Sequence, residues 1–321
     1  MSMNPRETTE KIKRDYQDYI ASILSVKDKE ITNLAHRAVK NAEFVKGPYL
    51  ETTLPFVEGH TLRYLAENEH LISAEFGKMG SVIHYDDWKL RIHQENALRQ
   101  IIERDRNMVV STGTGSGKTE CYLYPIFDAL MKEKEAGTLD SGVRALLIFP
   151  MNALANDQQK KLRKLLKFYP DITFGRYTGE TAHRGIKETS DEAELRLHQE
   201  YDLNHAQDTD EFMRKSIPNE MMCREKMAEK PPHILLTNYA MLEYMLLRPD
   251  TAPFFDNATA KNWKFIVIDE AHTYKGANGT EIALLLRRVK ERIRHNMTQP
   301  FRCIATSATL GSDDAKAGLA T

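Results

Sequence analysis

Short apolar runs that end in polar residues recur along the second two-thirds of the chain. They predict strands at Val109–Val110, Ala145–Phe149, Ile172–Arg176, Ile234–Leu236, Lys264–Ile268 and Arg302–Thr306. Between them lie longer segments with helical patterns, such as the largely apolar run Cys121–Met131. This alternation is typical of a parallel sheet with helices on both faces. We therefore predict an α/β domain with a mainly parallel central sheet over residues 86–321.

The first 85 residues have a different pattern. Apolar positions such as Tyr19, Ile20, Ile23 and Leu24 recur at helical spacing, whereas residues 46–85 are mixed and contain prolines. We expect residues 1–85 to form a mostly helical accessory region. A charged stretch at 182–232 interrupts the strand–helix alternation, and we expect it to be a helical, partly mobile insertion.

Composition limits the function classes. A hydrophobic content of 41% supports a real core, but a net charge of −1 does not favour tight, purely electrostatic binding of nucleic acid. A local basic run follows position 159, and it fits a nucleic-acid stripe and a solvated helix face equally well. It consists of Lys160, Lys161, Arg163, Lys164 and Lys167. Three widely spaced cysteines, a polar N-terminus and the lack of a long apolar run predict a cytoplasmic protein with no membrane partner.

A glycine-rich turn after the first predicted strand has the features of a phosphate cradle. Glycines let the backbone turn so that successive N–H groups face phosphate oxygens, and the helix that follows adds positive charge. Lys118 would contact the phosphates, and Thr119 would offer its hydroxyl to Mg²⁺. A strict P-loop has glycine where Thr112 stands, and a simple connecting loop is the alternative. The predicted nucleotide-binding residues are Thr114, Gly115, Ser116, Gly117, Lys118, Thr119 and Glu120.

The strand Lys264–Ile268 ends in Asp269-Glu270-Ala271-His272. Asp269 would hold Mg²⁺, in part through the water shell that this ion keeps. Glu270 would orient and deprotonate the attacking water, and His272 would sense the γ-phosphate. An acidic pair at a solvated strand end is common, but the phosphate cradle upstream favours NTP hydrolysis. Lys118, Asp269, Glu270 and His272 are therefore the predicted catalytic residues.

Polar residues also end the other predicted strands, where open α/β sheets bind ligands. Each of these loops alone is a turn or a helix cap as often as not. Together they fit a groove that follows a nucleic-acid backbone. The predicted contacts are Pro150, Met151, Asn152, Thr178, Gly179, Thr237 and Asn238. Ser307 and Thr309 would couple His272 to other elements.

These motifs, in this order, resemble those of superfamily 2 helicases of the DEAH type. The runs Phe149–Gln158, Leu235–Glu243, Tyr274–Glu281 and Gly47–Glu51 are similar to the MrfA-like bacterial DNA helicases, many of which belong to anti-phage systems such as Druantia or DISARM. The resemblance implies a RecA-like domain that uses ATP and Mg²⁺ and acts on DNA. An RNA-directed helicase and an ATP-gated interaction platform are the rival readings.

The family resemblance also implies a role for Gln94, as the side chain that reads adenine, since an amide can pair with N6 and N7. A surface helix position is the alternative. Arg91 stands where many relatives have an aromatic residue, which leaves adenine stacking open. Such helicases need a second RecA-like domain, which we expect to be missing from these 321 residues. Partners would be that domain of the same protein, DNA that is single-stranded or has a single-stranded region, and other defence proteins. Alone, the 321 residues should be nearly inactive.

Overall fold

The computed structural model describes residues 4–24, 26–44, 55–256, 261–294 and 301–308. The chain forms two compact units, Met1–Pro55 and Phe56–Thr321. Thr309 and the run Gly47–Glu51, both singled out by the sequence, lie outside the described residues. Each unit is described by itself below.

The N-terminal unit is a pair of helices, α1 (Pro5–Ile23) and α2 (Lys29–Asn41). The Asn4 side chain caps α1, and the Asp28 carboxylate accepts hydrogen bonds from the first turn of α2. Such caps satisfy backbone N–H groups that have no partner within the helix. Val39 is the buried residue among those described in the two helices. The predicted helical N-terminal region is confirmed.

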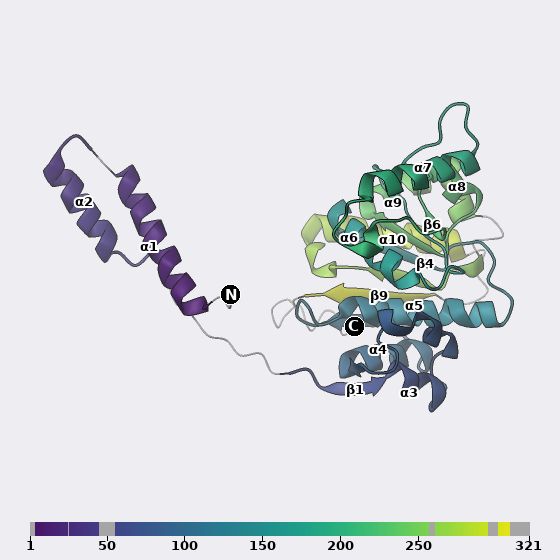
Figure 1. Ribbon diagram of the computed structural model, residues 1–321. Helices are drawn as coiled ribbons and strands as arrows, with labels where there is room; N and C mark the ends of the chain where they lie inside the picture. The colour runs from purple at the N-terminus through teal and green to yellow at the C-terminus, as the bar shows by residue number, and fades with distance from the viewer. Residues whose placement is uncertain (1–3, 25, 45–54, 257–260, 295–300, 309–321) are drawn as a thin grey trace. The chain divides into compact units, whose positions relative to one another are not determined.

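Within its described residues, the second unit holds a seven-stranded parallel sheet in the order β3-β9-β8-β4-β7-β5-β6 (Figure 1). The strands are β3 (Met108–Ser111), β4 (Ala145–Phe149), β5 (Phe174–Arg176), β6 (Glu220–Met221), β7 (Ile234–Asn238), β8 (Phe265–Ile268) and β9 (Arg302–Ser307). Because all of these strands are parallel, their carboxyl ends meet along one edge of the sheet. The predicted α/β class is confirmed.

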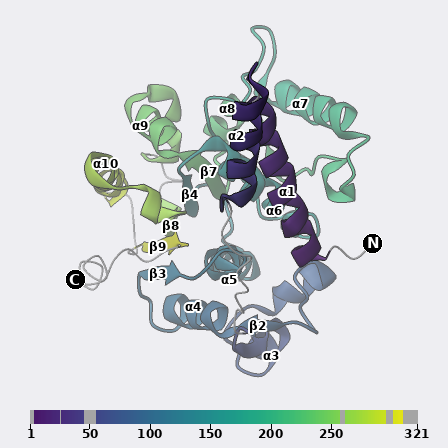
Figure 2. The same ribbon diagram turned by 90° about the vertical axis from the view of Figure 1, so that its left-hand side faces the viewer.

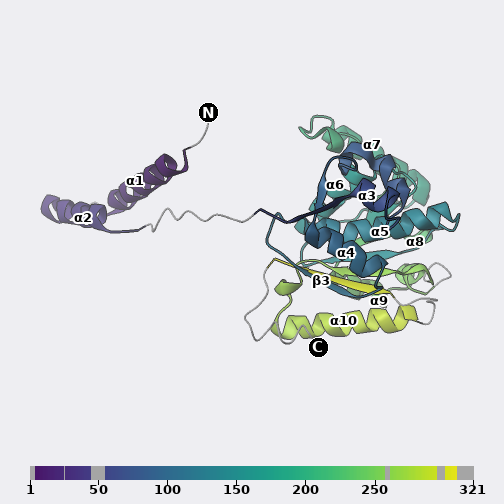
Figure 3. The same cartoon turned by 90° about the horizontal axis from the view of Figure 1, so that it is seen from below.

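Helices cover both faces of this sheet (Figures 2 and 3). Successive strand residues point to opposite faces, so Leu147 and Phe149 of β4 join one core, whereas Leu146 and Ile148 join the other. The first core is covered by α4 (Ile92–Ile102), α5 (Lys118–Glu135) and α6 (Asn152–Leu166), and the second by α9 (Tyr239–Leu247) and α10 (Gly276–Arg294). Each fully buried Leu or Phe contributes about 1.5–3 kcal/mol.

Residues 56–85 belong to the same compact unit as the sheet, although we expected the domain to begin at 86. They form β1 (Glu58–Thr61), α3 (Leu62–Glu67) and the 3-10 helix η1 (Ala74–Val82), and β1 pairs antiparallel with β2 (Lys89–Arg91). Leu65 and Phe76 are fully buried in the core that α5 covers. The Ser73 N–H donates to the Asp128 carboxylate of α5, at 2.8 Å. The boundary lies earlier because these apolar residues complete that core.

The charged stretch 182–232 carries the helices α7 (Ser190–His205) and α8 (Arg224–Glu229), as well as the short 3-10 helix η2 (Glu211–Met213). It also adds β6 to the edge of the sheet, which the sequence pattern did not indicate because this strand has only two residues. Glu220 of β6 is fully buried and forms an ion pair with Arg163 of α6, at 2.6 Å. The 3-10 helices η3 (Pro249–Phe254) and η5 (Ala271–Thr273) complete the described elements.

Candidate active site and nucleic-acid interface

The glycine-rich turn connects β3 to α5. Gly115 and Gly117 have φ values of 73° and 77°, which side-chain-bearing residues rarely adopt. A Cβ atom at Gly117 would also lie 2.3 Å from the Gln94 amide nitrogen. The positive φ of Gly117 and this close approach both favour glycine at the start of α5. The N-terminus of α5 follows this turn directly, and its free N–H groups and positive dipole end suit the binding of an anion such as phosphate.

The Lys118 ammonium lies over this turn and donates to the Thr112 carbonyl, at 3.1 Å. The Thr112 and Ser116 hydroxyls are 2.5 Å apart, and Ser116 is buried. The departure from a strict P-loop at Thr112 thus gives the loop an internal hydrogen bond rather than disrupting it. Thr114 and Gly115 lie exposed at the tip of the loop, and Glu120 pairs with Lys161 of α6, at 2.6 Å.

Asp269 and Glu270 follow the end of β8. Asp269 is 8% exposed and accepts a hydrogen bond from the Thr306 hydroxyl. Burial raises the pKa of Asp269, as does the charge of Glu270, while the bond from Thr306 and the charge of Lys118 oppose that rise. The Lys118 charge acts on Asp269, so the folded chain brings the two predicted motifs together at one carboxylate.

Glu270 has a φ of 49°, in the left-handed region that costs a residue other than glycine about 1–3 kcal/mol. Its N–H donates to the Thr306 hydroxyl at 3.2 Å, which helps to hold this bend. One Glu270 carboxylate oxygen lies 3.2 Å from Nδ1 of His272. Asp269 and Glu270 also have different partners, since Thr306 donates to the Asp269 carboxylate and His272 lies beside that of Glu270.

Strand β9 lies between the phosphate loop and the acidic motif, because β3 and β8 are its two neighbours. Its Ser307 hydroxyl is 3.3 Å from Nδ1 of His272. Ser307 and His272 are therefore in contact, and their coupling role stays a prediction. Thr306, one residue earlier, contacts both Asp269 and Glu270 and was missed by the sequence reasoning. Only its position beside the Ser-Ala-Thr run could have indicated it.

The donor set fits a magnesium nucleotide. Thr119 and Asp269 offer a hydroxyl and a carboxylate, the oxygen ligands that Mg²⁺ prefers. No group of three His, Cys, Asp or Glu side chains that could hold a metal ion occurs among the described residues. Mg²⁺ usually takes only one or two carboxylates, with water and phosphate as its other ligands. These residues therefore fit Mg²⁺ bound together with a nucleotide.

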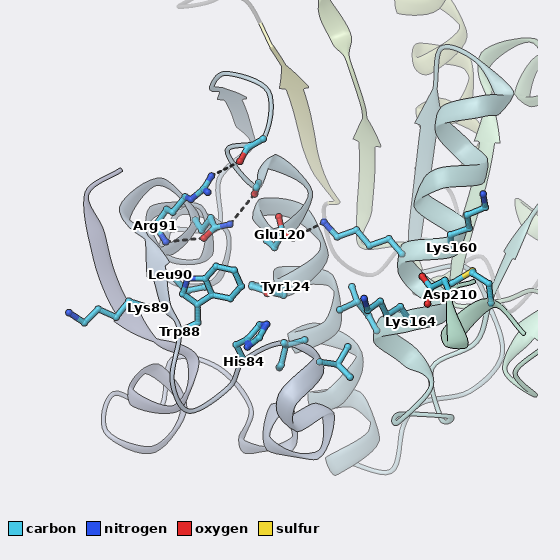
Figure 4. Close-up of a pocket in the computed structure, with 18 residues that line it drawn as sticks. His84, Trp88, Lys89, Leu90, Arg91, Glu120, Tyr124, Lys160, Lys164 and Asp210 are labelled. Carbon is cyan, nitrogen blue, oxygen red and sulfur yellow. Dashed lines mark hydrogen bonds and ion pairs between the residues drawn. The ribbon is translucent and has the colours of Figure 1, made fainter. Parts of the chain in front are cut away.

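A cavity of about 570 Å³ opens beside the phosphate loop (Figure 4). Arg91, Gln94, Gly115, Gly117 and Glu120 line its loop side. Trp88, Tyr124 and the α6 lysines Lys160, Lys161 and Lys164 lie around the rest. The cavity combines aromatic surface, cationic side chains and the phosphate loop, as a nucleotide base and ribose would require.

Gln94 faces this cavity, but its amide already has two partners. Its oxygen accepts from the Arg91 N–H at 2.9 Å, and its nitrogen donates to the Gly117 carbonyl at 3.1 Å. Gln94 therefore holds α4 against the phosphate loop, and its role in reading adenine stays a prediction. Arg91 donates to the Gly115 carbonyl at 2.7 Å, and its guanidinium lies 4.0 Å from the centre of the Phe56 ring. One face of that guanidinium is thus stacked on an aromatic ring.

The predicted nucleic-acid loops follow β4, β5 and β7, which are neighbours in the sheet. Asn238 donates to the Asn152 side chain at 2.7 Å, so two of the loops are in contact. Met151 and Gly179 are exposed, and Pro150 is half-buried. Thr178 and Thr237 are fully buried, and the Thr237 hydroxyl donates to the Tyr177 carbonyl at 2.7 Å. Thr237 therefore joins two loops, and contacts of these residues with nucleic acid remain predictions.

Comparison with known proteins identifies the family. The DEAD/DEAH box helicase profile matches residues 91–317, which include the phosphate loop, the acidic motif and the strand-end loops. The chain belongs to the DEAD/DEAH box helicase family. The sequence-based resemblance to superfamily 2 helicases is thereby confirmed, and the geometry above is that of a helicase ATP-binding domain.

Two curated relatives of this helicase chain are 30% identical to it. The alignment with the Druantia protein DruE of Escherichia coli (strain UMEA 4076-1) covers 95% of this chain and 20% of DruE. The ATP-dependent helicase YprA of Bacillus subtilis (strain 168) aligns over 227 residues, which cover 70% of this chain and 23% of YprA. The chain thus spans about a fifth of the length of these relatives.

Solved helicase structures share the fold. The DUF1998 helicase MrfA, in a complex with DNA and AMPPNP, matches with a TM-score of 0.52 and 27% identity, over 75% of this chain and 27% of MrfA. This likeness confirms the predicted similarity to the MrfA-like group. The DEAD-box helicase Mss116 bound to single-stranded RNA has a TM-score of 0.56 at 19% identity, which supports the fold alone. None of the described helices has the length and hydrophobicity needed to cross a membrane.

Proposed function

We propose that this chain is the ATP-hydrolysing part of a DNA helicase or translocase. The observation that carries the proposal is that Lys118 follows β3, Asp269 and Glu270 follow β8, and both strands flank β9, so that the charge of Lys118 acts on Asp269. An interaction platform would not need the acidic residue that activates water. The bound DNA of MrfA supports DNA as the substrate, and the name of DruE supports a role in anti-phage defence.

In the proposed mechanism, the phosphate loop and Lys118 bind the β- and γ-phosphates, and Thr119 with Asp269 holds Mg²⁺. When bound, Mg²⁺ would supply positive charge to the transferred phosphoryl group. Glu270 accepts a proton from the attacking water, while Asp269 is reserved for the metal ion. His272, which contacts both Glu270 and Ser307, passes the state of the site to β9 and its neighbours.

We also propose that a second RecA-like domain of the same protein closes over this face. Such a domain would supply an arginine to the γ-phosphate and the other half of the nucleic-acid track. A cytoplasmic location is part of the same proposal, and three free cysteines, two of them buried, agree with it.

The test is an ATPase titration of the whole protein with single-stranded and duplex DNA and with RNA of matched sequence. DNA should stimulate hydrolysis more than RNA, and Lys118→Ala should abolish the stimulated rate. Stimulation by RNA alone would make this an RNA-directed helicase. Binding of ATP without any stimulated turnover would favour an ATP-gated platform instead.

A further inference from the structure

The Glu180 carboxylate contacts Asn152, a predicted nucleic-acid contact, and Arg176. Asn152 donates to one of its oxygens, and Arg176 donates to the other, each at 2.9 Å. One anion thus bridges the loops that follow β4 and β5. The donors come from the end of β5 and the start of α6, and together they could equally bind a phosphate group of a DNA backbone.

The two donors are held from behind by other side chains. Nε of Arg176 donates to the Gln159 side chain at 2.9 Å, and Gln159 in turn donates to the buried Glu220, at 2.6 Å. The Asn152 oxygen accepts from Asn238, at 2.7 Å. Arg176 is only 16% exposed. Both donors would therefore keep their positions if Glu180 moved away.

Glu180, which accepts these hydrogen bonds, is less constrained than its two donors. The Glu180 side chain is 55% exposed, and it follows Gly179, beside which a Cβ atom would meet no other atom within 4 Å. The hydrogen bonds from Arg176 and Asn152 lower the pKa of Glu180, so this carboxylate is ionised at neutral pH. An exposed ion pair of this kind is weak, whereas guanidinium–phosphate pairs can bond through two parallel hydrogen bonds.

We propose that the Glu180 carboxylate occupies the place of a DNA backbone phosphate and must be displaced from Arg176 and Asn152 when DNA binds. This inference rests on the proposed function, because it assumes that the strand-end loops contact DNA. Glu180 then weakens binding to DNA of any sequence. Because DNA must displace Glu180, the loop after β5 changes its contacts only when DNA is bound.

The experiment measures binding of a fluorescent single-stranded DNA oligonucleotide by Glu180→Gln and wild type, using the whole protein over a series of salt concentrations. The matched control is Glu200→Gln. Glu200 is 52% exposed and pairs with Arg196 on α7 at 2.9 Å. The control substitution therefore removes the same charge from a similar exposed ion pair. Glu180→Gln should bind DNA about two- to fivefold more tightly than the control does.

A gain in affinity separates this proposal from a structural role, since damage to the loop would weaken binding. Arg176→Gln should weaken binding and lower the slope of log Kd against log salt concentration by about one. The proposal is overturned if Glu180→Gln binds no more tightly than Glu200→Gln while wild type binds DNA measurably. Failure of wild type and both glutamine variants to bind at low salt would overturn the proposed function itself, and this inference with it.

Discussion

Replacing Asp269 by asparagine should stabilise the fold while it abolishes metal-dependent activity. Asp269 is 8% exposed, and it lies beside a second carboxylate, Glu270. Asparagine has almost the same shape and can still accept the hydrogen bond from Thr306. The substitution therefore removes a buried negative charge without creating a cavity.

The sign of the expected stability change follows from the direction of the pKa shift. Burial raises the pKa of Asp269, so the folded protein binds that proton more tightly than the unfolded chain does. The stability that this proton contributes is present below the ordinary aspartate pKa of about 4 and is lost as pH rises through the folded value. At neutral pH the variant should gain about 1–2 kcal/mol, in the range of other charge-relieving substitutions.

The assay is thermal unfolding in EDTA from acidic to neutral pH. Each kcal/mol corresponds to about 2–4 °C for a domain of this size, so the variant should unfold several degrees higher at pH 7. The difference should shrink as pH falls. With Mg²⁺ and ATP present, wild type should instead unfold at the higher temperature, since only wild type is stabilised by the bound ligands. Asp87→Asn, at an exposed position, is the control and should change nothing. Equal or lower stability of Asp269→Asn at neutral pH would refute the reasoning.

Three further substitutions test the active site in the whole protein. Glu270→Gln should keep ATP binding but lower turnover by about 10²–10⁴, and a rate within about threefold of wild type would exclude Glu270 as the base. Gln94→Ala should relax a preference for ATP over GTP worth about 1–3 kcal/mol, measured as the ratio of kcat/KM values, and equal kinetics in wild type would exclude adenine reading. Thr306→Val removes the hydroxyl that Asp269 and Glu270 share and should destabilise the fold by about 1–3 kcal/mol, measured by urea unfolding. Its ATPase activity should also fall at acidic pH, because loss of that hydrogen bond raises the pKa of Asp269 further, and an unchanged pH profile would count against this role.

The local motifs were predictable because their chemistry depends on residues that are close in sequence. The phosphate loop is an example: Gly115 and Gly117 allow the tight turn, and Lys118 follows directly, so the local sequence sets the shape of the loop. The strand that ends in Asp269 and Glu270 is equally local. Short apolar runs likewise identified the strands, because a parallel sheet covered by helices is buried on both faces, and helical spacing of apolar residues identified the helices.

Other features depend on which strands become neighbours, and no local pattern encodes that. Thr306 acts on Asp269 only because β9 lies beside β8 in the sheet. Glu180 meets Asn152 because β5 and β4 lie on either side of β7, although the two residues are 28 positions apart. Likewise, Gln94 looked free to read a base until packing of α4 against the phosphate loop engaged its amide. The sequence by itself determined which chemical groups this helicase domain carries, and tertiary structure decided which of them meet, because contacts between distant residues arise only when the strands pair and the helices pack.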